Sequence, residues 1–571
     1  MAQNPSNKQS KKQPKKQPQK QETQLTQRHW QASYGAIPHE INPEAYRSVL
    51  EMMEQAMHQY ADLPAVRCAG MTLSYADLDI QSLNLAAYLQ NTLQVKKGDR
   101  IAVMLPNLPA FPIALLAIMR VGAIQVNVNP MYTARELEHQ LNDAGAKIIL
   151  VFNGVSATVA ECLSHTQLEQ VIHVAPGDGS AMTLPTPPLD SRISKAISLA
   201  DALQAGADLM LETVHLAPDD LLFLQYTGGT TGVSKGAALS HRNIVANTEQ
   251  FKAITWDAIC PGQEVIVTAL PLYHIFALMV NFITYFSLGA ENWLVPNPRD
   301  LDGLINTLKA ARPTVFTGVN TLFAGLVAHP RASEVDWGRL RLSGGGGAAV
   351  IRSVSDKWQA LTGTCIREGY GLSETSPILS FNPASTTEFN GSTGLPLPST
   401  DIKLLDESDQ QVGIGSEGEI CAKGPQVMGG YWQQDKANLV AFTADGYFRT
   451  GDVGVFDELG FLKIVDRKKD MIIVSGFNVY PNEIEAVVTG IDGVAECACV
   501  GIPDTKTGEA IRLFVVRTSV SELTEDDIIA QCRTQLTGYK LPKSICFLDV
   551  LPKTTVGKIL RRELRDTGKL V

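Results

Sequence analysis

The chain has 571 residues, 44% of them hydrophobic and 19% charged, which fits a globular enzyme with two or more domains. A net charge of −10 argues against a nucleic-acid-binding protein. Nine scattered cysteines, with no CxxC pair and no Cys/His cluster of zinc spacing, indicate reduced thiols in a cytoplasmic protein. No apolar stretch reaches the ~20 residues that span a bilayer, and no apolar run follows the N-terminal lysines, so we expect neither a transmembrane segment nor a secretory signal.

Residues 1–29 are rich in Lys, Gln and Pro and contain almost nothing to bury, so we predict a disordered basic tail. Its charge would allow peripheral contact with anionic lipid of the cytoplasmic membrane, but the missing apolar anchor favours a solvated tail. We expect the folded sequence to start near Tyr46.

Apolar runs of strand length then alternate with helical patterns. This alternation predicts parallel α/β sheets that helices cover on both faces. Ser74 and Ser240 are placed to cap the helices that follow them. The predicted helices are 46–60, 74–93, 111–123, 136–146 and 241–251, and the predicted strands are 100–107, 124–130, 147–153, 221–225 and 265–276.

The second half of the chain changes character. Strands after Ile402 are short and separated by turn residues, and from about residue 467 a short α/β alternation ends in a basic segment. We therefore predict a mixed α/β fold in which residues 30–466 form a large N-terminal domain of parallel α/β sheets with a β-rich subdomain. Residues 467–571 would form a small, mobile α+β C-terminal domain, with the boundary near residues 466–469.

The stretch YTGGTTGVSKG follows the apolar strand 221–225 and combines glycines, hydroxyls and one cation. Glycines let backbone N–H groups approach a ligand closely, and amides, hydroxyls and a lysine together suit a polyphosphate. The register excludes a Walker A loop, because a serine precedes the lysine and a glycine follows it. By composition alone, a flexible surface turn is an equally good interpretation. The residues of this glycine loop are Tyr226, Thr227, Gly228, Gly229, Thr230, Thr231, Gly232, Ser234, Lys235 and Gly236.

Six segments between residues 226 and 564 carry a family resemblance when they are taken together. In chain order they are YTGGTTGVSKG, PLYHIF, EGYGLSETSP, YFRTGDVG, VDRKKDMIIVSGFNVYPNEIE and LPKTTVGKILRREL. They resemble the adenylate-forming superfamily of acyl-CoA synthetases, luciferases and peptide-synthetase adenylation domains, over essentially the whole chain beyond the tail. Bacterial long-chain fatty acid–CoA ligases are the most similar, through residues 445–469. That segment departs from the long-chain signature at Tyr447, Phe448 and Arg449, where the signature has Trp, Leu and His.

The resemblance implies that the glycine loop holds the β- and γ-phosphates of ATP, with Thr227 and Glu374 near Mg²⁺, a cation that takes oxygen ligands. It also implies that Asp452 and Arg467 bind the ribose hydroxyls. Considered alone, Glu374 would be interpreted as a helix-capping or solvated acid and Asp452 as a turn residue. The implied adenine pocket consists of Gly344, Gly345, Gly346, Tyr370 and Gly371.

By the same resemblance, His274 lies beside the carboxylate site and the CoA channel, and Lys558 contacts the carboxylate and α-phosphate during adenylation. Without it, His274 is better interpreted as a core or surface histidine and Lys558 as a surface lysine. Lys469 matches the hinge about which the small domain swings, and Gly476 matches a residue of the CoA tunnel. The acyl tunnel is expected at Tyr273, Leu278, Gly318 and Val319.

The implied activity is the AMP-forming ligation of a fatty acid to CoA, with ATP and CoA as co-substrates and no protein nucleophile. No nucleic acid is expected as a partner, and a homodimer is left open. Three alternatives remain: a relative that stops at the adenylate or hands it to another carrier, a luciferase-like oxygenase, and a lipid-binding or transport protein without catalysis. The last is disfavoured because Lys235, Glu374, Asp452 and Lys558 are all intact.

Overall fold

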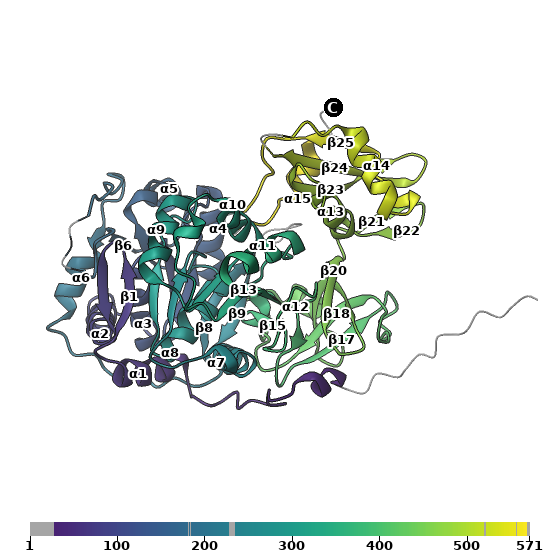
Figure 1. Ribbon diagram of the computed structural model, residues 1–571. Helices are drawn as coiled ribbons and strands as arrows, with labels where there is room; N and C mark the ends of the chain where they lie inside the picture. Colours follow the sequence, from purple (N-terminus) through teal and green to yellow (C-terminus); the bar gives the residue numbers. More distant parts are fainter. Residues whose placement is uncertain are drawn as a thin grey trace, which may run out of the picture.

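The computed structural model describes residues 28–180, 182, 184–227, 234–518, 521–554 and 557–567. Two large, mainly parallel sheets lie beside a smaller antiparallel sheet, and a small domain follows at the C-terminal end (Figure 1). This architecture confirms the predicted mixed α/β fold. The predicted basic tail lies outside the described residues as far as residue 27. Five residues of the glycine loop also lie outside them: Gly228, Gly229, Thr230, Thr231 and Gly232.

The first large sheet carries the glycine loop. Its strands are β3 (Arg100–Met104), β4 (Ile124–Asn127), β5 (Ile148–Phe152), β6 (Gln170–Val174), β7 (Ala196–Ser198), β8 (Leu221–Thr227) and β9 (Lys235–Ser240). They lie in the order β7-β6-β5-β3-β4-β8-β9, and all pairs are parallel except β8–β9. The helices of this stretch are α2 (Tyr75–Asn91), α3 (Ala110–Arg120), α4 (Ala134–Ala144), α5 (Ser156–Cys162) and α6 (Leu199–Gly206).

The second large sheet carries the other half of the predicted nucleotide site. Its strands are β1 (Pro64–Cys68), β2 (Met71–Ser74), β10 (Val265–Thr268), β11 (Glu291–Leu294), β12 (Val315–Gly318), β13 (Leu342–Gly345), β14 (Ile366–Gly371), β15 (Ile378–Phe381) and β16 (Leu395–Pro396). Their order is β16-β15-β14-β13-β12-β10-β11-β1-β2, parallel from β14 to β1. The accompanying helices are α1 (Val49–Gln59), α7 (His241–Ile254), the π-helix η5 (Phe276–Thr284), α8 (Tyr285–Ser287), α9 (Leu301–Ala311), α10 (Asn320–Ala328) and α11 (Arg352–Thr362).

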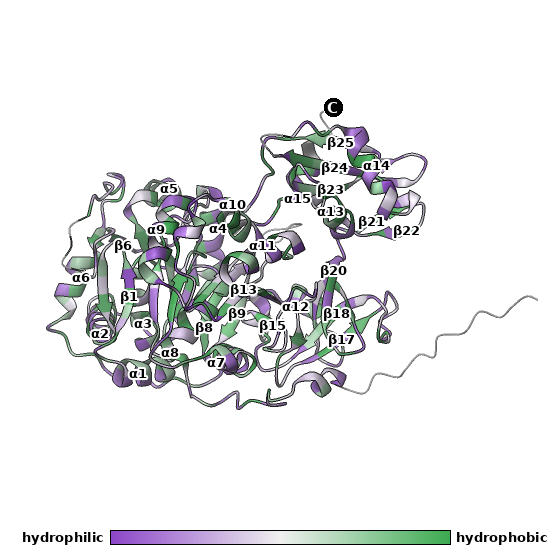
Figure 2. Cartoon of the chain, viewed as in Figure 1, coloured by the Kyte–Doolittle hydropathy of each residue, from purple (hydrophilic) through white to green (hydrophobic). Residues whose placement is uncertain are grey.

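Local sequence explains where several helices begin. Ser74 accepts a hydrogen bond from the backbone N–H of Asp77 at the start of α2, and Ser240 accepts one from Asn243 at the start of α7, which confirms both predicted caps. Every residue of α3 is buried, which explains its uninterrupted apolar sequence. Figure 2 shows hydrophobic strands in the interior of the large domain and hydrophilic residues on the surrounding loops and outer helix faces.

The strand predicted at residues 265–276 is shorter than expected. It ends at Thr268, and the chain turns before the π-helix η5 begins. Pro271 lacks a backbone N–H and cannot continue a central strand, so the apolar run after it enters a helix instead. This early turn places the segment PLYHIF at the end of β10 rather than inside the sheet.

The folded sequence starts earlier than Tyr46, so that prediction is wrong. Trp30 is buried and stacks on Phe456, and Tyr34 is buried and donates its hydroxyl hydrogen bond to the carbonyl of Pro396 at 2.6 Å. Isolated aromatic residues in a polar stretch have no periodicity, so they do not reveal where they pack.

The antiparallel sheet leads into the small domain. It consists of β17 (Asp401–Leu405), β18 (Gly418–Lys423), β19 (Phe448–Phe456) and β20 (Leu462–Arg467), in that order, with α12 (Asp435–Ala441) beside it. The small domain contains β21 (Ile472–Val474), β22 (Phe477–Val479), β23 (Val494–Asp504), β24 (Gly508–Arg517), β25 (Ser544–Phe547), α13 (Pro481–Thr489), α14 (Glu525–Gln535) and α15 (Arg561–Thr567). Every helix among the described residues is too short or too polar to traverse a bilayer.

Candidate active site

Helix α4 holds both described ends of the glycine loop. The hydroxyl of Tyr226, at the end of β8, donates to Asp143 Oδ2 at 2.6 Å. On the far side of the loop, His139 Nε2 lies 3.0 Å from the carbonyl oxygen of Ser234. Gly236 in β9 is also close to the Tyr226 ring, since a Cβ there would lie 3.1 Å from it. The described ends of the loop are therefore held by one helix and two strands, and no sequence motif predicts the roles of His139 and Asp143.

Glu374 lies on a short 3-10 turn, η7 (Ser373–Thr375), that packs against β8 and β9. Its side chain is buried, and burial raises the pKa of its carboxyl group, while a hydrogen bond from the Tyr431 hydroxyl at 2.8 Å opposes that shift. Thr227 ends β8 near this turn. The strands on either side of the glycine loop and the turn that carries Glu374 are therefore adjacent elements.

The predicted adenine and ribose residues meet between β13, β14 and β19. The hydroxyl of Tyr370 donates to Asp452 Oδ2 at 2.7 Å, and Arg467 Nε lies 3.5 Å from Asp452 Oδ1. Gly346 approaches the Gly369 carbonyl so closely that a Cβ would lie 3.2 Å from its oxygen. The flat surface that these glycines leave, with an aromatic ring and an acid at its edge, suits a base and its ribose. The further glycines at this place are Gly344, Gly345 and Gly371.

Lys558 reaches this site from the small domain. Its Cε lies 3.8 Å from the position that a Cβ of Gly347 would occupy, and Gly557 beside it packs against Thr321 and Val319. Burial is the main cause that lowers the pKa of Lys558 to about 8; Arg467 lowers it further, while Asp452 and Glu374 oppose the shift. A narrow cavity joins Lys558 to the large domain and is lined by Leu270, Pro271, His274, Phe276, Val319 and Gly347.

His274 lines the same cavity as Lys558. Burial, reinforced by the charge of Lys558, lowers the pKa of its imidazole to about 3, so the ring is neutral at pH 7. Its Nδ1 accepts a hydrogen bond from the backbone N–H of Phe276 at 3.3 Å, which fixes the proton of the neutral ring on Nε2. A neutral imidazole beside a lysine can donate a hydrogen bond to an anion without adding charge.

Comparisons of the chain with known proteins agree with a nucleotide-binding site at this position. Residues 53–432 match the family described as AMP-binding enzyme, and residues 483–558 match the AMP-binding enzyme C-terminal domain. The chain belongs to the AMP-binding enzyme family. The long-chain-fatty-acid–CoA ligase of Escherichia coli O6:H1 is 48% identical over 552 residues, covering 95% of this chain and 98% of that protein. The ligase of the same name from Bacillus subtilis is 36% identical, covering 95% and 98%.

Solved structures show the same fold. ATP-bound MatB from Rhodopseudomonas palustris superposes with a TM-score of 0.80 at 30% sequence identity, covering 91% of this chain and 99% of that chain. The two family matches together span both the large domain, with its glycine loop, and the small domain, with Lys558. The resemblance found in the six sequence segments is therefore confirmed at the level of the family.

Not all of the predicted residues of this AMP-binding enzyme come together. Gly476 lies in an exposed turn between β21 and β22 with φ +83°, and a Cβ there would have no atom within 4 Å. Leu278 is fully buried in η5, and a Cβ on Gly318 would contact Phe323. Of the four predicted tunnel residues, only Val319 lines the cavity at Lys558. Tyr273 precedes His274 in the chain and accepts a hydrogen bond from Gln225 through its carbonyl.

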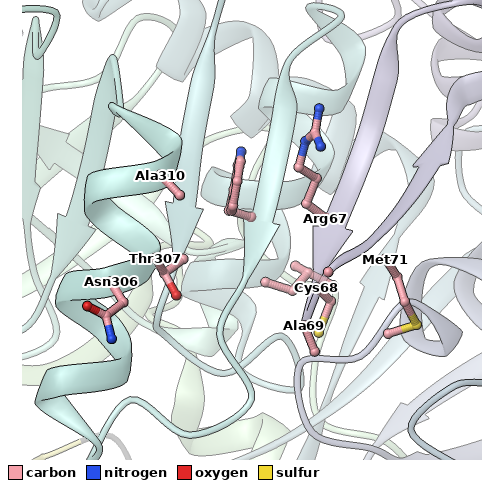
Figure 3. Close-up of a pocket in the computed structure, with 10 residues that line it drawn as sticks. Arg67, Cys68, Ala69, Met71, Asn306, Thr307 and Ala310 are labelled. Carbon is pink, nitrogen blue, oxygen red and sulfur yellow. The ribbon is translucent and has the colours of Figure 1, made fainter. Parts of the chain in front are cut away.

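A separate cavity of ≈ 280 Å³ lies between α9, β11 and the β1–β2 turn (Figure 3). Arg67, Cys68 and Met71 line it on one side and Asn306 and Thr307 on the other. Arg67 is already paired with Glu291. None of the sequence-predicted site residues lines this cavity, so its volume does not identify it as the reaction site.

The lowered pKa of Lys558 predicts a pH dependence for this AMP-binding enzyme. At a phosphate, only the charged form of the Lys558 amine would stabilise negative charge, and the charged fraction falls as the pH rises through about 8. We expect kcat/KM for ATP in pyrophosphate exchange to fall by about tenfold per pH unit above that value, because kcat/KM reports groups of the free enzyme. A Lys558→Arg variant, whose guanidinium stays charged, should lose this decline. A profile that is flat from pH 7 to 10 in the unmodified protein would contradict the prediction.

Proposed function

We propose that the protein is an AMP-forming long-chain fatty acid–CoA ligase. The observation that carries the proposal is the position of Lys558, which projects from the small domain into a site that contains Glu374, Asp452 and Arg467. A lysine buried near Asp452 and Glu374, with Gly347 across the cavity, suits an anionic substrate whose charge increases during reaction. The 48% identity to proteins named long-chain-fatty-acid–CoA ligase supports the choice of acid and acceptor.

In the first half-reaction, a fatty acid carboxylate attacks the α-phosphorus of ATP. Pyrophosphate leaves with the electron pair of the broken P–O bond, and an acyl-adenylate forms. Negative charge gathers on phosphate oxygens in the transition state, where Lys558 and the N–H groups at the glycine loop would stabilise it. Asp452 and Arg467 would hold the ribose hydroxyls, and Tyr370 would lie against the adenine.

In the second half-reaction, the CoA thiolate attacks the acyl carbon of the adenylate. The C–O bond to phosphate breaks, and AMP leaves as acyl-CoA forms. Neutral His274 would lie beside the reacting carboxyl group and donate a hydrogen bond from Nε2. No side chain forms a covalent intermediate in either step.

A swing of the small domain would separate the two half-reactions. Lys469 follows β20 and lies outside both neighbouring sheets, so it is placed where a few backbone angles could rotate the domain. In the present arrangement Lys558 occupies the site and Gly476 lies in an exposed turn. This is the arrangement that adenylation needs, and the rotated one would bring Gly476 to the path of CoA.

The residues at the site fit a magnesium ion that is held mainly by its substrate. Among the described residues, no group of three or more His, Cys, Asp or Glu side chains could hold a metal. Glu374 offers one carboxylate, and Thr227 would add a hydroxyl, which suits Mg²⁺ because this ion usually keeps waters and binds phosphate oxygens. Bound there, the ion would neutralise charge on the phosphates.

Acyl chain length would be selected by an apolar passage that starts at Val319 and Phe276 and continues toward Leu278 and Gly318. Each buried CH₂ group contributes about 0.8 kcal/mol, so such a passage would strongly favour a long acid over acetate. The fit of a long chain would require the side chains around Leu278 to move, because Leu278 is fully buried.

The experiment that tests this function is ATP–pyrophosphate exchange with acids from acetate to oleate, together with AMP release with and without CoA. We expect exchange to be greatest with long acids and AMP turnover to require CoA. Exchange without CoA-dependent turnover would instead support an enzyme that hands its adenylate to another carrier. Lack of exchange with any acid would contradict adenylation of a carboxylate.

We further propose a cytoplasmic enzyme that attaches peripherally to the membrane, because its acids partition into lipid and residues 1–29 are basic. Flotation with anionic liposomes, with and without those residues, tests the attachment, and failure of both forms to float would contradict it. Sedimentation analysis would test whether the protein forms a homodimer.

A further inference from the structure

Tyr431 occupies a position between the two halves of the phosphate site. Its hydroxyl donates to Glu374 Oε1 at 2.8 Å, and Lys235 Nζ lies over its ring, 5.2 Å from the centroid. One side chain therefore contacts both the lysine of the glycine loop and the carboxylate expected to bind the metal. No motif in the sequence pointed to this residue.

The backbone around Tyr431 is hydrogen-bonded to Glu374 on one side and to strand β9 on the other. The N–H of Met428 donates to the Glu374 carbonyl at 2.8 Å. On the other side, Ala238 N–H donates to Gly430 at 3.1 Å and Trp432 N–H donates to Gly236 at 2.8 Å, which joins the segment to β9 immediately after Lys235.

Helix α12 holds the tyrosine itself. Asn438 accepts from the N–H of Tyr431 at 2.8 Å and donates to its carbonyl at 3.0 Å. Gly430, at φ +149°, lies so close to Asn438 that a Cβ would be 3.0 Å from its amide. These hydrogen bonds fix the backbone at Tyr431, so the fold determines the point from which the ring extends into the site.

We propose that Tyr431 is a positioning residue that couples the phosphate site to the metal site, its hydroxyl orienting the Glu374 carboxylate and its ring holding the Lys235 ammonium in place for the phosphates. The inference rests on the roles proposed above for Glu374 and Lys235. A phenol that occupies Oε1 leaves Oε2 of the carboxylate for Mg²⁺. A ring that holds the ammonium reduces the conformational entropy that the long lysine side chain loses when ATP binds.

The two contacts can be removed in two steps. Tyr431→Phe keeps the ring and removes the hydroxyl, and Tyr431→Leu removes both. Isothermal titration calorimetry of the full-length variants with ATP, with and without Mg²⁺, measures binding without turnover. For Tyr431→Phe we expect the tightening of ATP binding by Mg²⁺ to shrink about tenfold, because a hydrogen bond to a charged acceptor is lost. ATP binding without Mg²⁺ should be unchanged in this variant and weakened in Tyr431→Leu.

A matched substitution at another tyrosine separates positioning from a general structural role. Tyr447→Phe is the matched control, since the Tyr447 ring also lies beside lysines, 4.3 Å from Lys403 and 5.6 Å from Lys423, on the antiparallel sheet.

Three results would overturn the proposal: an unchanged Mg²⁺ effect in Tyr431→Phe, equal weakening of ATP binding with and without Mg²⁺, or the same response in Tyr447→Phe. Pyrophosphate exchange by the unmodified protein is measured separately. A protein that binds ATP with the expected Mg²⁺ response but shows no exchange would contradict the proposed function and leave the coupling intact.

Discussion

Lys558→Gln is expected to reduce fatty-acid-dependent pyrophosphate exchange by about 10²–10³-fold, the usual cost of removing one group that stabilises transition-state charge. The buried amine of Lys558 extends from the small domain into the cavity that His274 also lines. Glutamine keeps most of the length and a hydrogen-bond donor but removes the charge. The loss should appear in kcat, because the charge increases in the transition state.

The same variant should still catalyse the second half-reaction. When synthetic acyl-adenylate and CoA are supplied, acyl-CoA formation by Lys558→Gln should be close to that of the unmodified protein, since the role proposed for the lysine lies in the first step. The matched control is Lys553→Gln, five residues earlier, where the lysine is ion-paired with Glu496 inside the small domain. Equal losses in both half-reactions, or an equal loss in the control, would show that the segment and not the charge is needed.

Glu374→Gln is expected to reduce exchange by about 10²–10³-fold at low Mg²⁺ concentration, a loss of several kcal/mol of charge stabilisation. The neutral amide keeps the shape and can still accept from Tyr431, but it is a poor ligand for a hard cation. A higher Mg²⁺ concentration should restore part of the activity. The measurement is exchange rate against Mg²⁺ concentration at saturating ATP.

Glu368 provides the control for that experiment. It is also a buried glutamate, on β14, and burial raises the pKa of its carboxyl to about 8, so that it is mostly protonated at pH 7. One oxygen accepts from the Val350 N–H at 3.3 Å, which an amide oxygen can also do. Glu368→Gln should therefore leave the Mg²⁺ response at pH 7 unchanged. A similar loss in both variants would mean that any change of a buried glutamate here disturbs the sheet.

Much of the fold could be predicted because apolar runs mark buried parallel strands. The predicted strands at 100–107, 124–130 and 147–153 correspond to β3, β4 and β5, and two serine caps mark the starts of α2 and α7. Periodicity does not show which strands share a sheet, so the division into two large sheets was not predicted. The short strand β10 was overestimated because Pro271 lies inside a longer apolar run.

The residues of the candidate site likewise divide into those that sequence motifs predict and those that they do not. Residues within motifs, such as Glu374, Asp452 and Lys558, were found through the order of six segments, and the structure brings them near one another. Tyr431, Asp143 and His139 were missed because their partners are distant in the sequence: 57 residues separate Tyr431 from Glu374, and 83 separate Asp143 from Tyr226. Such contacts leave no local spacing to detect.

The register of β19 and β20 has a consequence for the fate of the intermediate. Asp452 and Arg467 are direct partners across these strands, so both belong to the antiparallel sheet and precede Lys469 in the chain. A rotation at Lys469 would withdraw Lys558 and leave the ribose contacts in place. The acyl-adenylate would then remain bound while its surroundings change, which protects a reactive mixed anhydride from escape and hydrolysis between the two half-reactions.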